Sequence, residues 1–278
     1  MYSFQTNVTS LVAAENLRNN SDFQSRTITR LTSGYRINTS ADDAAGLAVA
    51  NKFRTDVAEL SQGVRNANDG IGTLQIIDGG LNQISNILDR LKTLATESAS
   101  DTFSGSRTTL NSEFTTLLGE IDRQAANIGL ASGGGTGGRN NIALSVYIGG
   151  GDTQGHSAVS VALNGATNIV DTNGLGVNGN TITSKTLALT ALTNIESAVA
   201  NLGVTQGAVG AGENTLNYAS QLAQSQITNF SAADSHIRDA DVAAEAANLT
   251  KAQVLQQASV AALAQANAAP TSLLKLFQ

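Results

Sequence analysis

Asp42 and Asp43 are the residues whose types and spacing first suggest chemistry in this sequence. Adjacent carboxylates can bind a divalent cation, but such a site needs about six or more oxygen ligands, and no third ligand lies nearby. Ser40 precedes the pair, and a hydroxyl followed by carboxylates is typical of the start of a helix, where these groups meet its free N–H groups and positive dipole. The pair therefore predicts a capped helix start.

The histidines and a glycine run are the other candidates for a metal or phosphate site. His156 and His236 lie in unrelated sequence contexts, whereas zinc needs three or four ligands. Residues 133–138 are almost all glycine, but the run follows no strand signal and lacks the lysine of a phosphate-binding loop. We interpret the run as a flexible linker. We therefore expect no catalytic residue, no metal and no cofactor. We also expect that the protein is not an enzyme.

Composition excludes several further classes. The net charge is −6 with no run of basic residues, so we expect no nucleic-acid partner. The chain has no Cys, which excludes disulfides and thiolate metal sites. No apolar signal-peptide region lies near the start. The uncharged stretch 252–274 contains several Gln and Asn residues and Pro270, so we do not expect it to insert in a membrane.

Helical elements must position these residues. Apolar residues from Val8 to Leu31 recur at helical spacing, and Ser33-Gly34 is a stop signal. After Asp43, apolar residues alternate at spacings of four and three, which is typical of a coiled-coil seam. The series slips once, between its fifth and sixth members: Leu60, Val64, Ala67, Ile71, Leu74, Ile77, Leu81, Ile84, Leu88, Leu91 and Ala95.

Four glycines interrupt this seam. Each is expected to destabilise the helix by about 1 kcal/mol relative to Ala. They favour either close helix approach or a local bend, and the sequence leaves both open: Gly70, Gly72, Gly79 and Gly80.

The rest of the chain predicts a second helix, a hairpin and two more helices. Residues 110–121 have helical spacing and follow a polar turn. Residues 142–148 and 159–163 alternate apolar and polar side chains around a glycine-rich turn, which indicates a β-hairpin. Helical spacing returns near Leu187, and residues 241–269 are rich in Ala, the strongest helix former.

We therefore predict a mainly α fold, a long coiled-coil-like helical bundle with its N- and C-terminal helices paired, plus a small β-hairpin region in the middle. The terminal helices carry apolar stripes without an obvious third layer, which favours assembly. The alternative is that both dock on the bundle as an ordinary all-α domain. We divide the chain into an inner domain formed by 1–41 and 237–278, a second helical domain formed by 42–130 and 187–236, and an outward-facing segment, 131–186.

Several motifs in this sequence resemble the signatures of bacterial flagellin. The N-terminal motifs are Leu31 to Asn38, Ala41 to Ala50 and Asn66 to Ile71. The C-terminal motifs are Ile237 to Asp241, Ala252 to Ala258, Ala264 to Asn267, Pro270 and the Leu-rich end. They cover about 1–130 and 187–278, in order and at the expected ends.

The resemblance implies a subunit that polymerises into the flagellar filament outside the cell. It implies export through the flagellar type III apparatus without a cleaved signal peptide. The expected partners are further copies of the chain, a chaperone on the C-terminal helix, and the filament cap and junction proteins. The assembly candidates are Leu11, Leu31, Arg36, Ile37, Leu249, Leu255, Leu263, Leu273 and Leu274. A homologue from the hook-filament junction is the alternative.

The resemblance also implies recognition by the vertebrate Toll-like receptor for flagellin. Arg90, Leu94 and Glu113 match the contact positions of that family. The sequence departs from the family pattern at Asp89 and Thr93, and Lys92 replaces an Arg. In the alternative interpretation, Arg90 and Glu113 are solvated charges and Leu94 belongs to the seam.

Surface Ser and Thr residues are O-glycosylated in many flagellins. The candidates in the middle segment are Ser157, Ser160, Thr167, Thr172, Thr181 and Thr183.

Overall fold

A computed structural model describes residues 7–132, 144–149, 157–163, 165 and 168–274. The elements, in chain order, are α1 (Val8–Ser33), α2 (Ala44–Ala99), α3 (Arg107–Asn127), β1 (Leu144–Tyr147), β2 (Ala158–Val161), α4 (Lys185–Arg238) and α5 (Val242–Leu274). They form two compact units: unit 1 comprises residues 1–55 and 229–278, and unit 2 comprises residues 56–228. The mainly α fold with one small hairpin is confirmed.

The sequence-based boundaries at 41/42 and 236/237 lie near breaks between helices. They fall in the α1–α2 linker and at the end of α4, whereas the two compact units divide inside α2 and α4.

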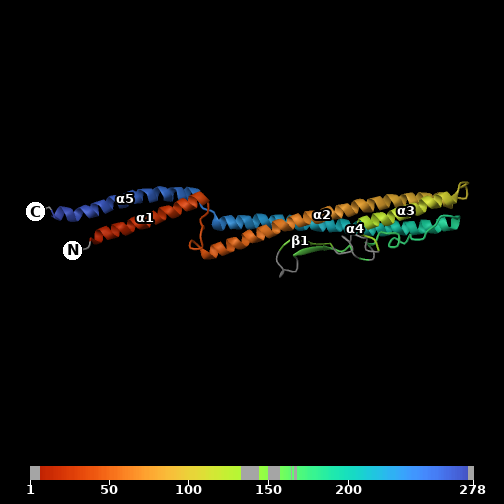
Figure 1. Ribbon diagram of the computed structural model, residues 1–278, viewed down its shortest axis with the longest axis horizontal. Coiled ribbons are helices and arrows are strands. Elements are labelled where there is room, and N and C mark those ends of the chain that lie inside the picture. The colour runs from red at the N-terminus through yellow and green to blue at the C-terminus, as the bar shows by residue number, and fades with distance from the viewer. Residues whose placement is uncertain (1–6, 133–143, 150–156, 164, 166–167, 275–278) are drawn as a thin grey trace. The chain divides into compact units, whose positions relative to one another are not determined.

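Unit 1 is built on α1 and α5, which run antiparallel and side by side (Figure 1). Asn7 begins α1, because its side-chain oxygen accepts a hydrogen bond from the backbone of Ser10 at 3.1 Å. Gly34 ends the helix with a φ of 75°, and its N–H donates to the carbonyl of Arg30 at 2.9 Å. The predicted stop at Ser33-Gly34 is confirmed.

The cap of α2 differs from the prediction. Asp43, rather than Ser40, is the capping residue, since its carboxylate accepts from the backbone of Gly46 at 2.9 Å. Asp42 instead folds back over the linker and accepts from the backbone N–H groups of Asn38 and Thr39, at 3.2 and 3.0 Å. The linker therefore forms a turn before the helix, which places Ser40 too far from the helix to cap it.

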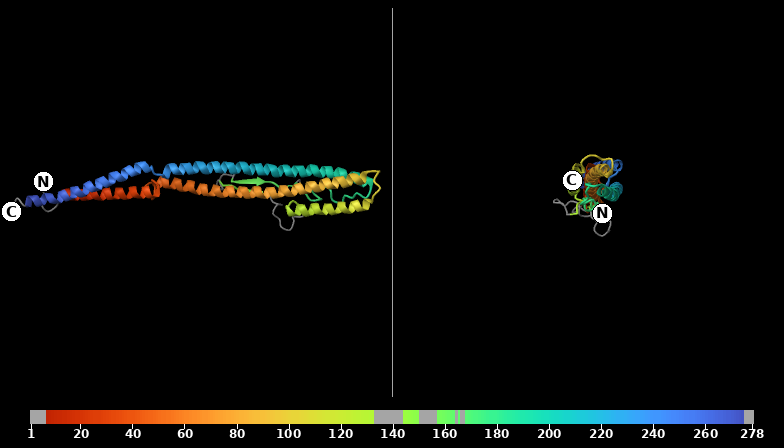
Figure 2. Two further views of the ribbon diagram at one scale, coloured as in Figure 1. Left: turned by 90° about the horizontal axis from the view of Figure 1, so that it is seen from above. Right: turned by 90° about the vertical axis from the view of Figure 1, so that its right-hand side faces the viewer.

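Unit 2 is a bundle of α2, α3 and α4, in which α3 runs alongside the C-terminal part of α2 (Figures 1 and 2). The α2 seam runs at strict three-four spacing, without the predicted slip, through Leu60, Gly63, Ala67, Gly70, Leu74, Ile77, Leu81, Ile84, Leu88, Leu91, Ala95 and Ser98, all buried. The apparent slip arose because Val64 and Ile71 were counted, but Gly63 and Gly70 occupy the seam.

The hairpin is antiparallel, with Leu144 opposite Val161 and Tyr147 opposite Ala158. It lies against both α2 and α4 (Figure 2), where glycines make room for it. A Cβ on Gly63 would lie 1.7 Å from the carbonyl oxygen of Ile148. A Cβ on Gly70 or on Gly212 of α4 would meet a strand valine at 2.8 or 2.6 Å. The predicted hairpin is confirmed, and it is docked on the helices.

The four glycines that the sequence pattern predicted to interrupt the α2 seam lie in two different environments. Gly70 and Gly80 accommodate close packing, because a Cβ on Gly80 would lie 2.3 Å from the Ile128 side chain. Nothing lies within 4 Å of a Cβ built on Gly72 or Gly79.

The buried seam on α4 has heptad spacing as far as Leu216 and then takes a second step of four to Ser220. Its buried residues are Ala188, Ala191, Ile195, Ala198, Leu202, Thr205, Val209, Gly212, Leu216, Ser220 and Ala223. Val199 shares the helical spacing of Ile195 and Leu202 but is 41% exposed, because the small alanines of the seam pack inward instead. Among the described helices, α4 alone is long and apolar enough by composition to cross a membrane.

Candidate functional site

The seam between α1 and α5 is unusually polar. Its positions follow three-four spacing on both helices and are buried or half-buried. On α1 they are Ser10, Ala13, Leu17, Asn20, Gln24, Thr27 and Leu31, and on α5 they are Glu245, Leu249, Ala252, Gln256, Ser259, Leu263 and Ala266. Half of these fourteen positions are polar, so the pair buries little aliphatic surface internally.

Hydrogen bonds connect the two helices along this seam. The amide of Asn20 donates to the hydroxyl of Ser259 at 2.7 Å, and the hydroxyl of Ser10 donates to the side chain of Asn267 at 2.8 Å. The amide of Asn7 also donates to the carbonyl of Ala266 at 2.9 Å. These contacts satisfy polar groups that pairing removes from water.

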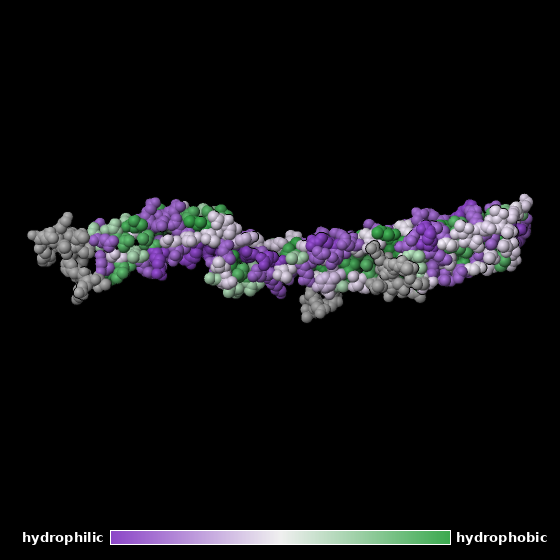
Figure 3. All heavy atoms as spheres, viewed as in Figure 1, coloured by the Kyte–Doolittle hydropathy of each residue, from purple (hydrophilic) through white to green (hydrophobic). Residues whose placement is uncertain are grey.

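Eight aliphatic side chains of the pair are exposed at its surface (Figure 3). They are between 38% and 63% exposed, and they are Val8, Leu11, Val12, Ile28, Val242, Val254, Leu255 and Val260. Large exposed apolar surfaces usually mark interaction sites. A groove beside them is lined by Ala14, Leu17, Arg18, Ser21, Asp22, Gln256 and Val260. This outer aliphatic surface is the candidate functional site of unit 1.

Ion pairs and backbone hydrogen bonds connect the end of α1 and the α1–α2 linker to the end of α4 and the start of α5. We call this set of contacts the junction. Arg30 lies 3.4 Å from the carboxylate of Glu245 and 3.8 Å from that of Asp42. The backbone hydrogen bond from Thr39 holds the pKa of Asp42 below its usual value, with smaller contributions from the Thr39 hydroxyl, the N–H of Asn38 and the charge of Arg30. The carboxylates of Asp42 and Glu245 thus attract the Arg30 guanidinium from two different segments of unit 1.

Arg36 completes this junction. Its guanidinium donates to the carbonyl of Ile237 at 2.8 Å, and its backbone N–H donates to the carbonyl of Arg238 at 2.6 Å. Tyr35 forms an antiparallel bridge with Asp239, and the guanidinium of Arg238 lies 4.3 Å from the centre of the Tyr35 ring. Arg36 thus contributes to the connection within one chain.

The assembly candidates fall into different environments. Leu11 and Leu255 lie on the outer aliphatic surface. The half-buried Leu31, Leu249 and Leu263 belong to the α1–α5 seam. Leu273 and Leu274 form the end of the described α5 backbone.

Ile37 does not belong to an exposed assembly surface. It is 1% exposed and packs next to Gly46, where an added Cβ would lie 2.9 Å from its Cδ1. The linker folds Ile37 into unit 1, and a side chain buried there cannot contact a second copy.

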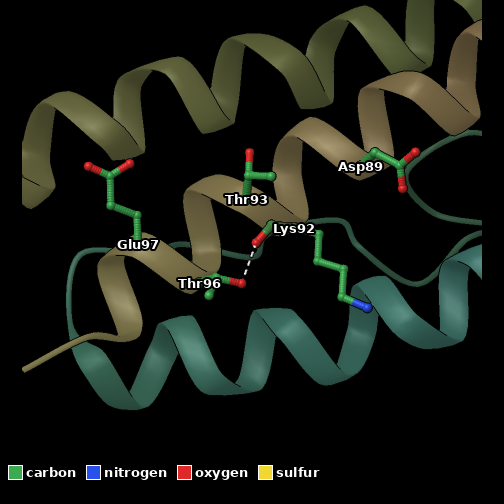
Figure 4. Close-up of a pocket in the computed structure, with 5 residues that line it drawn as sticks. All are labelled: Asp89, Lys92, Thr93, Thr96 and Glu97. Atoms are coloured by element: carbon green, nitrogen blue, oxygen red, sulfur yellow. Dashed lines mark hydrogen bonds between the residues drawn. The ribbon is translucent and has the colours of Figure 1, made fainter.

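The receptor candidates lie on unit 2, where α2 runs between α3 and α4 (Figure 4). Arg90 on α2 and Glu113 on α3 form an exposed ion pair at 2.6 Å. The neighbouring groove is lined by Asp89, Lys92, Thr93, Thr96 and Glu97.

Leu94 contradicts the prediction of a contact stripe, because it is 1% exposed. It packs inward beside the α2 seam, as the alternative interpretation expected. Of the three predicted receptor contacts, Arg90 and Glu113 therefore lie at the surface and Leu94 does not.

The candidate hydroxyls differ in accessibility. Ser160 and Thr183 are exposed, and Ser157 and Thr181 are half-buried. Thr172 is only 5% exposed, since its backbone is held by the carboxylate of Asp122 at 2.8 Å, so it is a poor modification site. Thr167, His156 and the glycine run 133–138 lie outside the described residues. In the described part of the chain, no three His, Cys, Asp or Glu residues are grouped so as to hold a metal ion.

Comparison with known proteins identifies the family. The model of the bacterial flagellin N-terminal helical region matches residues 4–128, and that of the C-terminal helical region matches residues 192–277. The chain belongs to the bacterial flagellin family. Flagellin from Listeria monocytogenes is 32% identical over 98% of both chains. A flagellar filament 30.7 kDa core protein from Treponema maltophilum is 31% identical, also over 98% of both chains.

Family membership confirms the resemblance and makes the chain a structural protein, not an enzyme. The two matched regions contain the whole of α1, α2, α3 and α5. They also contain α4 from residue 192 to its end. The unmatched residues 129–191 include the hairpin, which is the part that the signatures left unassigned.

Proposed function

We propose that this flagellin is a subunit of the extracellular flagellar filament, and that it polymerises through the outer aliphatic surface of the α1–α5 pair. The observation that carries the proposal is that this pair has many polar side chains in its internal seam and many aliphatic side chains exposed to solvent. Polar groups occupy half of its internal seam, while eight aliphatic side chains remain exposed. Further copies of the chain supply the apolar surface that the single chain does not bury.

The energetic argument favours assembly over isolated pairing. Fully burying one Leu or Val side chain contributes about 1.5–3 kcal/mol. The exposed fractions of eight such residues therefore offer a larger apolar contribution between copies than the mixed seam offers within one copy. Two helices without further burial are only marginally stable in water.

The same surface supports the partners that the family resemblance implies. Before assembly, the outer aliphatic residues of α5 need protection from water and from aggregation. This requirement supports an export chaperone on α5. Export through the type III apparatus and later contact with the filament cap and junction proteins are implied by the family resemblance.

Replacing Leu11 and Val12 with Asn is expected to raise the critical concentration for elongation of filament fragments by about tenfold, equivalent to about 1.4 kcal/mol per subunit. Both side chains are more than half exposed, so the folded single chain should tolerate the change. Sedimentation of polymer at a series of monomer concentrations measures the effect.

The matched control replaces Thr9 and Ser25, two exposed polar residues of the same helix, with Asn. Its critical concentration should change by less than about threefold, because little apolar surface is removed. Equal critical concentrations for the two double variants would reject the outer surface as the assembly element.

A second function, recognition by the vertebrate Toll-like receptor for flagellin, is supported by the exposed Arg90–Glu113 pair beside a groove that charged residues and threonines line. Arg90→Ala is expected to raise the concentration for half-maximal receptor signalling by about tenfold, because an exposed arginine is a frequent binding hot spot. Elongation should not change, since an exposed ion pair stabilises a fold by only about 0–1 kcal/mol. A reporter-cell assay with purified monomer measures signalling.

Arg65→Ala provides the control on the same helix, since Arg65 is exposed and donates to the side chain of Gln62, one turn away, at 2.6 Å. It should leave signalling unchanged. If Arg90→Ala and wild type signal equally, Arg90 is not a receptor contact.

A further inference from the structure

Apolar packing orients α5 on α1 mainly through Leu249 and Leu263, the two leucines of its inward stripe, and the rest of the α5 composition adds little to that preference. Twelve of its thirty-three residues are alanine, and they are spread around the helix. A helix normally turns its most apolar stripe towards its partner. Here Val254 and Val260 face outward at 60% and 52% exposure, while Ser259 and the carboxylate of Glu245 face inward.

Polar contacts recur along the inward stripe of α5. Glu245, Ala252, Ser259 and Ala266 are seven residues apart and lie on one line of the helix. Three points near this line bind α1: Glu245 contacts Arg30 at 3.4 Å, Ser259 accepts from Asn20 at 2.7 Å, and Asn267 accepts from Ser10 at 2.8 Å.

These contacts discriminate between orientations of the helix. The bridge between Tyr35 and Asp239 limits sliding of α5 along α1 but does not fix its rotation about its own axis. A rotated α5 would place an alanine or valine against Arg30 and Asn20, and would leave these polar groups without their partners. Polar pairs that are partly removed from water can select one arrangement among helices that could pack in several ways, and the Arg30–Glu245 and Asn20–Ser259 contacts are of this kind.

We propose that Glu245, Ser259 and Asn267 are positioning residues that fix the rotational orientation of α5 on α1. Through that orientation they determine which aliphatic side chains of α5 face outward. The proposal concerns the contact between α1 and α5 of the same chain, and it applies wherever these two helices are paired, in the monomer or in the polymer.

Cysteine cross-linking tests the orientation directly, because the natural chain has no Cys. One variant carries Asn20→Cys and Ser259→Cys, whose native side chains touch. A second carries Asn20→Cys and Ala261→Cys; Ala261 is exposed and lies about 200° around the helix from position 259. A short bifunctional thiol reagent is applied to the full chain, as monomer and as polymer, and the cross-linked single chain is separated from cross-linked dimers on a non-reducing gel.

In an otherwise natural background, the 20–259 pair is expected to cross-link within one chain about tenfold more than the 20–261 pair. Adding Glu245→Ala and Asn267→Ala should bring the two yields to within about threefold of each other, because the polar contacts of α5 with Arg30 and Ser10 are then removed. Helix content by circular dichroism should stay unchanged, since Ala favours helix.

The control background carries Thr250→Ala and Lys251→Ala, which also removes two polar groups but from the exposed side of α5. It should keep the tenfold preference. A preference that survives Glu245→Ala and Asn267→Ala would show that other contacts orient α5. Loss of both cross-links together with helix content would show that these residues are needed for pairing itself, which also overturns the proposal. A chain that shows the expected pattern but does not elongate filament fragments would refute only the proposed function.

Discussion

A chain that lacks Ala243 to Gln278 is expected not to elongate filament fragments, with a rate reduced by at least about a hundredfold. The deletion removes almost all of α5 and with it Glu245, the partner of Arg30. The remaining α1 is a single helix with a polar seam exposed to water, and isolated helices are marginal in water. Light scattering after addition of sonicated filament fragments measures elongation.

The deletion should leave unit 2 intact, because its core lies within residues 56–228. The thermal unfolding transition of the α2–α3–α4 bundle therefore provides the internal control and should move by less than about 2 °C. Elongation at the wild-type rate by the shortened chain would exclude the α1–α5 pair as the assembly element.

Gly63→Ala is expected to lower the free energy of unfolding of unit 2 by about 2 kcal/mol. The new Cβ would lie 1.7 Å from the backbone oxygen of Ile148, and a backbone atom cannot turn away as a flexible side chain can. The hairpin must shift, which also disturbs the bond from Asn66 to the carbonyl of Tyr147 at 3.0 Å and the bond from the Tyr147 hydroxyl to Glu59 at 2.7 Å. Urea unfolding followed by circular dichroism gives the free energy.

Gly72→Ala is the matched control, nine residues further along the same helix. Apart from the adjacent backbone of α2, no atom of the described residues lies within 4 Å of its added Cβ, so the substitution should stabilise unit 2 by about 0.5–1 kcal/mol through helix propensity. The two variants are then expected to differ by roughly 10 °C in melting temperature. Similar melting temperatures would show that the hairpin is not held in contact with Gly63.

Much of the helical fold could be predicted from apolar spacing and end signals. The stop at Ser33-Gly34 and the paired strands followed from local chemistry, and the structure confirms both. The continuous α2 seam could not be found in this way, because Gly63 and Gly70 occupy two of its positions. A glycine carries no apolar signal, and its role appears only when the packed hairpin is known.

The candidate site was predicted less well, because polarity does not show which side of a helix faces inward. Val8, Leu11, Val12 and Ile28 were read as one stripe together with Leu17 and Leu31, yet only the latter two contribute to the α1–α5 seam. Buried Asn20 and Ser259 gave no recognisable signal alone, since each needs the other helix as its partner. The family resemblance supplied the assembly role that spacing left open, but it placed Leu94 at a surface that packing buries.

Helical reconstruction of the polymer by electron microscopy tests the central claim most directly. The claim is that the outer aliphatic surface of the α1–α5 pair is covered by neighbouring copies. We expect a density map to show Leu11, Val12, Val254 and Val260 packed against helices of adjacent subunits, with Asn20 and Ser259 still paired within each subunit. A map in which those four side chains face solvent, and copies contact one another only through unit 2, would contradict this account.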